Sequence, residues 1–202
     1  MNKCIGLFGG SFDPPHMGHK ALLEAAFPEL NIDEVWVIPV GSPVHRQLSG
    51  KATSEQRLSW LNTMFADDLR VSIVDWEVNQ AQPTPAIATL RRFKAENPDI
   101  TPLWLMGMDS FLDMPNWVEY PKHQQLCNVA VFSRKGHQTS LKTNCWQLVG
   151  ANQLLQQTGH VCWLDVDLPN ISASQIRQNP QVHQQDLHQD TCNAIVSCYA
   201  SD

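Results

Sequence analysis

Long apolar runs, which mark membrane proteins, are missing from this sequence. No run approaches the length that a transmembrane helix requires, so we expect no membrane partner. The apolar stretch over residues 1–8 ends at Gly9 and Gly10, before the core of a signal peptide could form. The sequence therefore predicts a cytoplasmic protein.

Clustered positive charge is also scarce. The chain has 14 Lys and Arg against 20 Asp and Glu, which gives a formal net charge of −6. Affinity for a nucleic-acid backbone comes from clustered Lys and Arg. We therefore expect no nucleic-acid partner, whereas a small anionic substrate needs only a local positive pocket.

Paired cysteines are absent as well. The six cysteines are irregularly spaced and contain no C-x-x-C pair, which argues against a disulfide framework and against a zinc site. No other cluster of side chains in the sequence has the spacing of metal ligands. The thiols are interpreted as buried or idle (Cys4, Cys127, Cys145, Cys162, Cys192 and Cys198).

The sequence does contain enough apolar residues for one substantial core. Its 202 residues are 43% apolar and 17% charged, which is ordinary for a globular protein. This length suits a single domain over residues 1–202. Residues 190–199 have a helical pattern, and we expect a peripheral helical C-terminal segment from about residue 178.

Strand-like and helix-like segments alternate along the chain. This order predicts an α/β fold, a Rossmann-like doubly wound parallel sheet with helices on both faces. Ligands of such sheets bind at the carboxyl ends of the strands, so the turn after the first strand is the expected site. The predicted strands cover residues 4–8, 34–40, 71–78, 103–106, 129–133 and 161–166, and the predicted helices cover residues 18–27, 54–65, 86–96, 116–126 and 147–157.

The first predicted strand runs into an unusual segment over residues 9–19. Gly9 and Gly10 would let the backbone turn tightly, and the next helix would offer unpaired N–H groups and the positive end of its dipole. The segment is therefore interpreted as a phosphate cradle. It is neither the Walker loop nor the G-x-G-x-x-G fingerprint, since the sequence contains neither pattern.

Two histidines begin the helix that follows. His16 and His19 are three residues apart, so their rings can face the same side as the N–H groups. Imidazoles beside a phosphate suit the stabilisation of charge in phosphoryl-type transfer. The alternative is that one or both of them only cap the helix or pack against it.

At this point the sequence resembles a known superfamily. The string from Gly9 to His19 is similar to the G-x-F-D-P-x-H-x-G-H signature of the nucleotidyltransferases, whose H-x-G-H element also occurs in class I aminoacyl-tRNA synthetases. Within the superfamily the chain is most similar to the bacterial nicotinate-mononucleotide adenylyltransferases. The likeness covers about residues 4–177.

The resemblance implies a site for ATP and its phosphates. It assigns His16 and His19 to catalysis, as groups that stabilise charge on the transferring phosphorus. Further matches are G-x-D-S at residues 107–110, an Arg closing the fifth strand, and I-S-x-[ST]-x-[IL]-R at residues 171–177. The residues implied to bind ATP or phosphate are Gly9, Gly10, Ser11, Phe12, Gly107, Asp109, Arg134, Ile171, Ser172, Ser174 and Arg177.

The resemblance also implies a site for the mononucleotide. The segment Pro43-Val44-His45-Arg46 is similar to the P-P-H-K loop of the relatives, and Pro115-Asn116-Trp117 to their P-x-W, whose indole stacks on the pyridine ring. Where relatives have P-S-Y-T-x-D-T-L, residues 83–90 read P-T-P-A-I-A-T-L, so the Tyr and the Asp are missing. The implied mononucleotide-binding residues are His45, Arg46, Thr84 and Trp117.

Together these matches imply adenylyl transfer from ATP to nicotinate mononucleotide, giving deamido-NAD and pyrophosphate. Mg²⁺ is expected as cofactor, held mainly by substrate and water rather than by the protein. The substrates would be ATP and a pyridine mononucleotide, and a homo-oligomer is compatible with the sequence. Open alternatives are nicotinamide mononucleotide or another phosphorylated acceptor, and a non-catalytic nucleotide-binding module.

Overall fold

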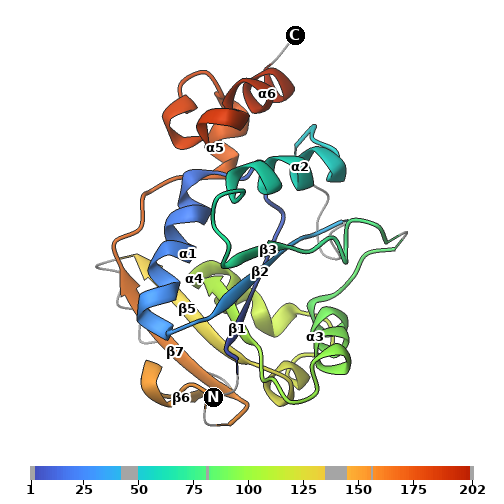
Figure 1. Cartoon of the computed structure of the whole chain (residues 1–202), viewed down its shortest axis with the longest axis vertical. Coiled ribbons are helices and arrows are strands. Elements are labelled where there is room, and N and C mark those ends of the chain that lie inside the picture. Colours follow the sequence, from blue (N-terminus) through green and yellow to red (C-terminus); the bar gives the residue numbers. More distant parts are fainter. Residues whose placement is uncertain (1–2, 42–49, 81, 135–144, 156, 201–202) are drawn as a thin grey trace.

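The central element is a parallel sheet in the order β3-β2-β1-β4-β5-β7-β6. The computed structural model describes residues 3–41, 50–80, 82–134, 145–155 and 157–200 (Figure 1). Every described strand pair is parallel. The strands are β1 (Ile5–Gly10), β2 (Glu34–Pro39), β3 (Val71–Ile73), β4 (Leu103–Gly107), β5 (Asn128–Arg134), β6 (Gln147–Leu148) and β7 (His160–Val166).

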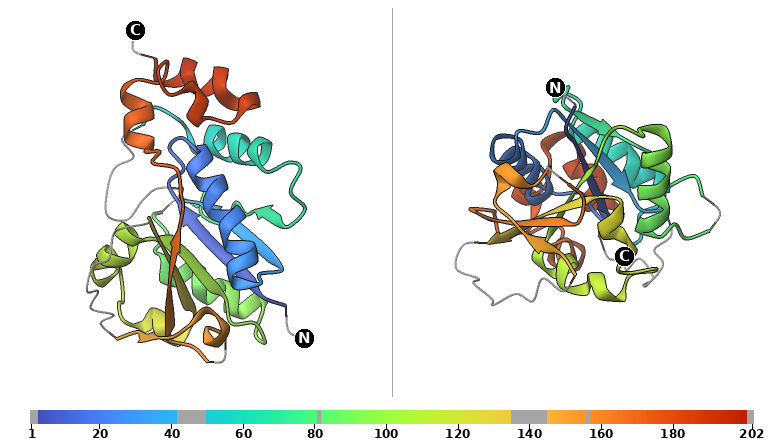
Figure 2. Two further views of the ribbon diagram at one scale, coloured as in Figure 1. Left: turned by 90° about the vertical axis from the view of Figure 1, so that its left-hand side faces the viewer. Right: turned by 90° about the horizontal axis from the view of Figure 1, so that it is seen from below.

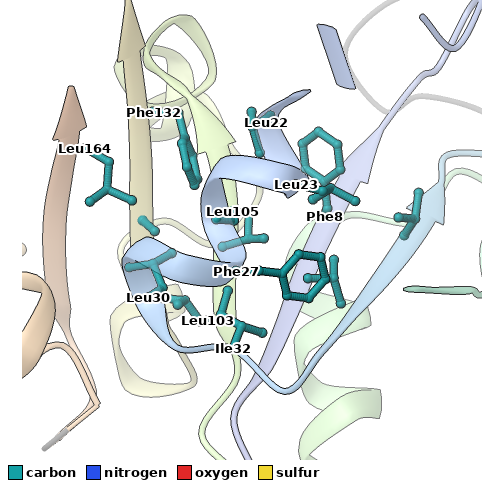
Figure 3. Packing of buried hydrophobic residues seen from close by; sticks show 14 of the residues in the cluster. Phe8, Leu22, Leu23, Phe27, Leu30, Ile32, Leu103, Leu105, Phe132 and Leu164 are labelled. Atoms are coloured by element: carbon teal, nitrogen blue, oxygen red, sulfur yellow. The ribbon is translucent and has the colours of Figure 1, made fainter. Parts of the chain in front are cut away.

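Helices cover both faces of this sheet, which confirms the predicted α/β Rossmann-like class. One face packs against α1 (Met17–Leu30) and α2 (Ser54–Met64), and the other against α3 (Ala86–Glu96) and α4 (Met108–Asp113). Alternation along β4 separates the two cores, since Leu103 and Leu105 belong to the α1 side and Trp104 and Met106 to the α3 side. Figure 3 shows the α1 side.

The C-terminal segment forms a third layer. Helices α5 (Ala173–Gln178) and α6 (Gln189–Tyr199) lie together at the end of the molecule opposite to the N-terminus (Figures 1 and 2). They share a small core with α2, which contains Trp60, Ile176 and Ile195. Among the described residues, none of the helices combines the length and the apolar character needed to cross a membrane.

Two predicted helices are wrong. Residues 116–126 form only part of η1 (Met114–Asn116) and the short 3₁₀ segment η2 (Lys122–Gln125), because Glu119 is left-handed and Pro121 lacks the N–H group that a continuous α-helix needs. Residues 147–157 contain β6 and η3 (Ala151–Gln153). There the N–H of Gln147 donates to the carbonyl of Gly159, so pairing beside β7 overrides the helical pattern. The strand predicted over residues 71–78 ends at Ile73.

The α1 side of the core sets the stability of the sheet, and Leu105 is a direct test. Its side chain is fully buried in β4 beneath α1. We expect Leu105→Ala to lower the free energy of unfolding by about 2–5 kcal/mol, from lost burial and the cavity that remains. Leu69→Ala is the control. Because Leu69 is 97% exposed, its substitution should lower the free energy of unfolding very little. Urea denaturation measures both variants, and equal effects would contradict this account of the core.

Candidate active site

The two glycines at the end of β1 do not make the turn that the sequence suggested. Gly9 and Gly10 are still strand residues, paired with Ile38 and Pro39 of β2, so that expectation is wrong. Glycine is required at both positions for another reason. A Cβ on Gly9 would lie 3.0 Å from Cζ2 of Trp104, and one on Gly10 would lie 3.0 Å from Cζ of Phe12. The glycines therefore admit two aromatic rings against the strand.

The turn itself occurs at Phe12. Its φ of 46° lies in the left-handed region, which a non-glycine residue adopts only when its surroundings hold it there. Arg57 Nη1 donates to the carbonyl of Ser11 at 2.6 Å, and Arg177 Nη1 donates to the carbonyl of Asp13 at 2.6 Å. Two arginines from distant helices thus fix the backbone on either side of the turn.

Arg57 is a residue that the sequence reasoning missed. It is fully buried in α2, and its Nη2 donates to the carbonyl of Gly41 at 3.2 Å. Burial lowers the pKa of Arg57, and the nearby charge of Asp13 opposes that shift. Because one guanidinium bonds the chain after β1 and the chain after β2, it ties two strand ends together.

His16 and His19 lie together where α1 begins. Their rings stack with centroids 3.8 Å apart and an interplanar angle of 25°. The backbone N–H of His16 donates to Nδ1 of His19 at 3.1 Å, so the proton of the His19 ring sits on Nε2. Burial, and then the neighbouring His16, hold the pKa of His19 well below its usual value. His19 is therefore a neutral donor at pH 7.

A cavity of about 440 Å³ opens beside the end of β1. One wall carries the indoles of Trp104 and Trp117, whose rings make an edge-to-face contact at 6.3 Å. Among the predicted site residues, the lining includes Gly9, Gly10, Ser11, Thr84, Asp109 and Trp117. The structure thus brings residues from β1, α4 and the chain before α3 around one space.

Two predicted residues lie at the start of α4. Gly107 is the N-cap of α4, and Asp109 is exposed in the first turn. A Cβ on Gly107 would meet nothing within 4 Å, so nothing in the described structure requires glycine there.

Phe12 is 2% exposed, and its ring packs on His19 at 4.9 Å. Only its backbone is thus left for contact with a phosphate.

The late motif lies against the start of α1. Ser172 is the N-cap of α5, and its Oγ is 2.7 Å from Oγ of Ser174. Ile171 is close to Gly18, since a Cβ there would lie 3.6 Å from the Cβ of Ile171. With Arg177 bonded to Asp13, hydroxyls and a guanidinium from the end of the chain meet the histidine motif.

Three predicted residues receive no side-chain placement. His45 and Arg46 lie outside the described residues. Arg134 is the last residue of β5, where the backbone is described and the side chain is not.

The altered segment at residues 83–90 forms the entrance to α3. Pro85 is the N-cap, so α3 begins without a side-chain cap and presents its first N–H groups near the cavity. Beside it, buried Glu77 accepts a hydrogen bond from Oγ1 of Thr89 at 2.6 Å, and burial raises the pKa of Glu77 to about 7. The sequence reasoning missed Glu77 and Trp104. Glu77 lies four residues beyond the end of β3, on the side of the sheet where ligands are expected, whereas Trp104 is the second residue of β4 and its place in the strand gave no such signal.

His123 supports Trp117 from behind. It is 1% exposed, its ring meets the indole edge to face at 5.8 Å, and both ring nitrogens lack a hydrogen-bond partner among the described residues. Burial lowers the pKa of His123 to about 4. The stacking wall of the cavity therefore rests on a neutral imidazole.

Comparison with known proteins agrees with this geometry. The family model described as cytidylyltransferase-like matches residues 7–179. The chain therefore belongs to the cytidylyltransferase-like family. A relative from Chromobacterium violaceum, named a probable nicotinate-nucleotide adenylyltransferase, is 39% identical over 137 residues, or 67% of this chain and 65% of the relative. A relative of the same name from Neisseria gonorrhoeae is 33% identical over 180 residues, or 88% of this chain and 87% of the relative.

A solved structure shares the fold. The Plasmodium falciparum nicotinic acid mononucleotide adenylyltransferase complexed with NaAD superposes with a TM-score of 0.76 at 18% identity, over 97% of this chain and 96% of that chain. At this identity the likeness concerns the arrangement of strands and helices.

His123 predicts a pH dependence of stability. Its folded pKa of about 4 lies below the ordinary histidine value of 6.5, so the unfolded chain binds more protons between these values and stability falls as the pH falls through them. We expect the stability that His123 contributes to decline below about pH 6.5, by up to about 1.4 kcal/mol per pH unit, while the raised pKa of Glu77 opposes that decline equally in the wild type and the variant. His123→Phe, which keeps a ring behind Trp117, should flatten that decline. Urea denaturation from pH 4.5 to 7.5 measures it, and identical slopes would refute the assignment.

Proposed function

We propose that this protein transfers the adenylyl group of ATP to nicotinate mononucleotide, releasing deamido-NAD and pyrophosphate. The observation that carries the proposal is the stacked His16–His19 pair at the start of α1, which follows a strand whose last residues, Gly9 and Gly10, line a cavity walled by two indoles. The printed names of the relatives from Chromobacterium violaceum and Neisseria gonorrhoeae support the same reaction.

In the proposed reaction the mononucleotide phosphate attacks the α-phosphorus of ATP directly. The bond from that phosphorus to the bridging oxygen breaks, and pyrophosphate leaves with the electron pair. His19 would donate from Nε2 to an oxygen on the phosphorus as charge develops there, with His16 beside it. Ser174 and the free side of the Arg177 guanidinium would hold the leaving group, and the backbone at Gly9–Phe12 would contact the phosphates.

The pyridine ring would enter the cavity. Trp117 would stack on it, and Trp104 and His123 would keep that indole in place. Since Pro85, Ala86 and Ala88 carry no donor side chains, the acid group would meet the first N–H groups of α3 and the positive end of its dipole. Recognition through the backbone explains how the site tolerates the missing Tyr and Asp.

Mg²⁺ would enter this site with ATP, as a partner of the substrate. The described residues contain no group of three or more His, Cys, Asp or Glu side chains able to hold a metal ion. Mg²⁺ binds readily through phosphates and water, and when bound with ATP it would neutralise phosphate charge. ATP use also agrees with the cytoplasmic location expected from the sequence.

A panel of acceptors tests the proposal. Pyrophosphate release is measured with ATP and Mg²⁺ against nicotinate mononucleotide, nicotinamide mononucleotide and phosphopantetheine in parallel. We expect the highest kcat/KM with the nicotinate compound. A higher kcat/KM with either other acceptor would identify that compound as the substrate. ATP binding without turnover on any acceptor would identify a nucleotide-binding module instead.

Substitutions at His19 separate catalysis from helix capping. His19→Ala should lower kcat by about two orders of magnitude or more, the usual cost of one transition-state donor. In His19→Asn the amide oxygen can still accept the N–H of His16, but the Nε2 donor is gone, so the same loss is expected. His183→Ala, remote from the cavity, should keep the wild-type rate. If His19→Asn restored activity, the role of the ring would be structural.

A further inference from the structure

Tyr199 reaches the histidine motif from the other end of the chain. Its hydroxyl donates to Oδ1 of Asp13, which is 186 residues away in sequence, and both side chains are buried. Burial, followed by the hydrogen bond to Asp13, raises the pKa of Tyr199 far above its usual value, so the phenol keeps its proton. None of the motifs recognised in the sequence includes Tyr199.

Asp13 is the point where several segments converge. Its Oδ2 accepts the N–H of Gly50 at 2.9 Å, and a Cβ on Gly50 would lie 2.1 Å from Oδ1, so only glycine fits there. Its carbonyl accepts from Arg177. Asp13 follows the left-handed Phe12 and precedes His16 by three residues, so its position sets the path of the chain into α1.

The helix that carries Tyr199 is firmly docked. The ring of Tyr199 packs near Trp60 of α2, with centroids 6.3 Å apart, and Ile195 and Leu187 bury themselves in the same small core. Lys51 Nζ donates to the carbonyl of Ala200 at 3.2 Å, which ties the end of α6 to the chain just before α2. The Tyr199 hydroxyl therefore lies on a helix that packs against the rest of the protein (Figures 1 and 2).

We propose that Tyr199 is a positioning residue of the adenylyl-transfer site: through Asp13 it holds His16 and His19 where the transferring phosphorus needs them. The proposal rests on the proposed function for its kinetic consequences. Arg57 and Arg177 hold the same turn through backbone carbonyls, whereas Tyr199 and Gly50 hold the Asp13 carboxylate itself. The C-terminal helix would then be part of the active-site framework, and residues 1–202 would act as one domain.

Tyr199→Phe tests the proposal, because it keeps the ring in its core and removes only the hydroxyl. We expect kcat to fall by about ten- to a hundredfold, the effect of a displaced catalytic group, with KM for ATP and for the mononucleotide near wild type. The control is Ile195→Val, which loosens the same core and keeps the hydroxyl, and should retain the wild-type kcat. Wild-type kcat in Tyr199→Phe would overturn the proposal, as would an equal loss in Ile195→Val.

A second readout needs no substrate. Imidazole ¹H–¹⁵N spectra report the Nδ1 of His19, which accepts a hydrogen bond from the backbone of His16. The His16 and His19 signals should shift in Tyr199→Phe and stay in place in Ile195→Val. Unmoved signals in Tyr199→Phe would overturn the positioning role even if the acceptor panel gave no turnover, so the two proposals fail separately.

Discussion

The site depends on holding one short stretch of backbone, residues 11–13, in a course that it would not take alone. Phe12 is left-handed, and such a conformation persists only where the surroundings over-determine it. Here the restraints are hydrogen bonds from Arg57 in α2, Arg177 in α5 and Tyr199 in α6. The sheet supplies the strand end, and the helices around it supply the geometry of the His16–His19 pair.

Much of this arrangement was visible in the sequence. The alternation of apolar strands and amphipathic helices predicted the parallel sheet, and the motif after β1 predicted where the histidines would lie. These signals are local, because a strand or helix pattern and a short motif both lie within a few residues. The late motif at residues 171–177 also joined the first motif in space, through Arg177 and Asp13.

The parts that the sequence could not predict depend on contacts between distant residues. An arginine in an amphipathic helix is normally a solvated group, and nothing local distinguished Arg57 from the others. The same holds for Tyr199 and for His123, whose importance lies in what each one touches. The failed helix at residues 116–126 has a different cause, since Pro121 lies in the interior of the predicted helix and a local signal against it was present in the sequence.

The charge state of the site follows from this burial. His19 is held neutral and His123 is neutral, while Glu77 has a pKa near 7. A cationic cluster would bind the phosphates strongly before the reaction. Such binding does not speed the chemical step, because it stabilises the ground state as much as the transition state. A neutral donor fixed by a rigid frame acts most on charge that develops as the bonds change. An acidic protein with a net charge of −6 can therefore process two anionic substrates. The proposed reaction would need well-placed donors at the reacting phosphorus, while Arg57 and Arg177 hold the backbone frame.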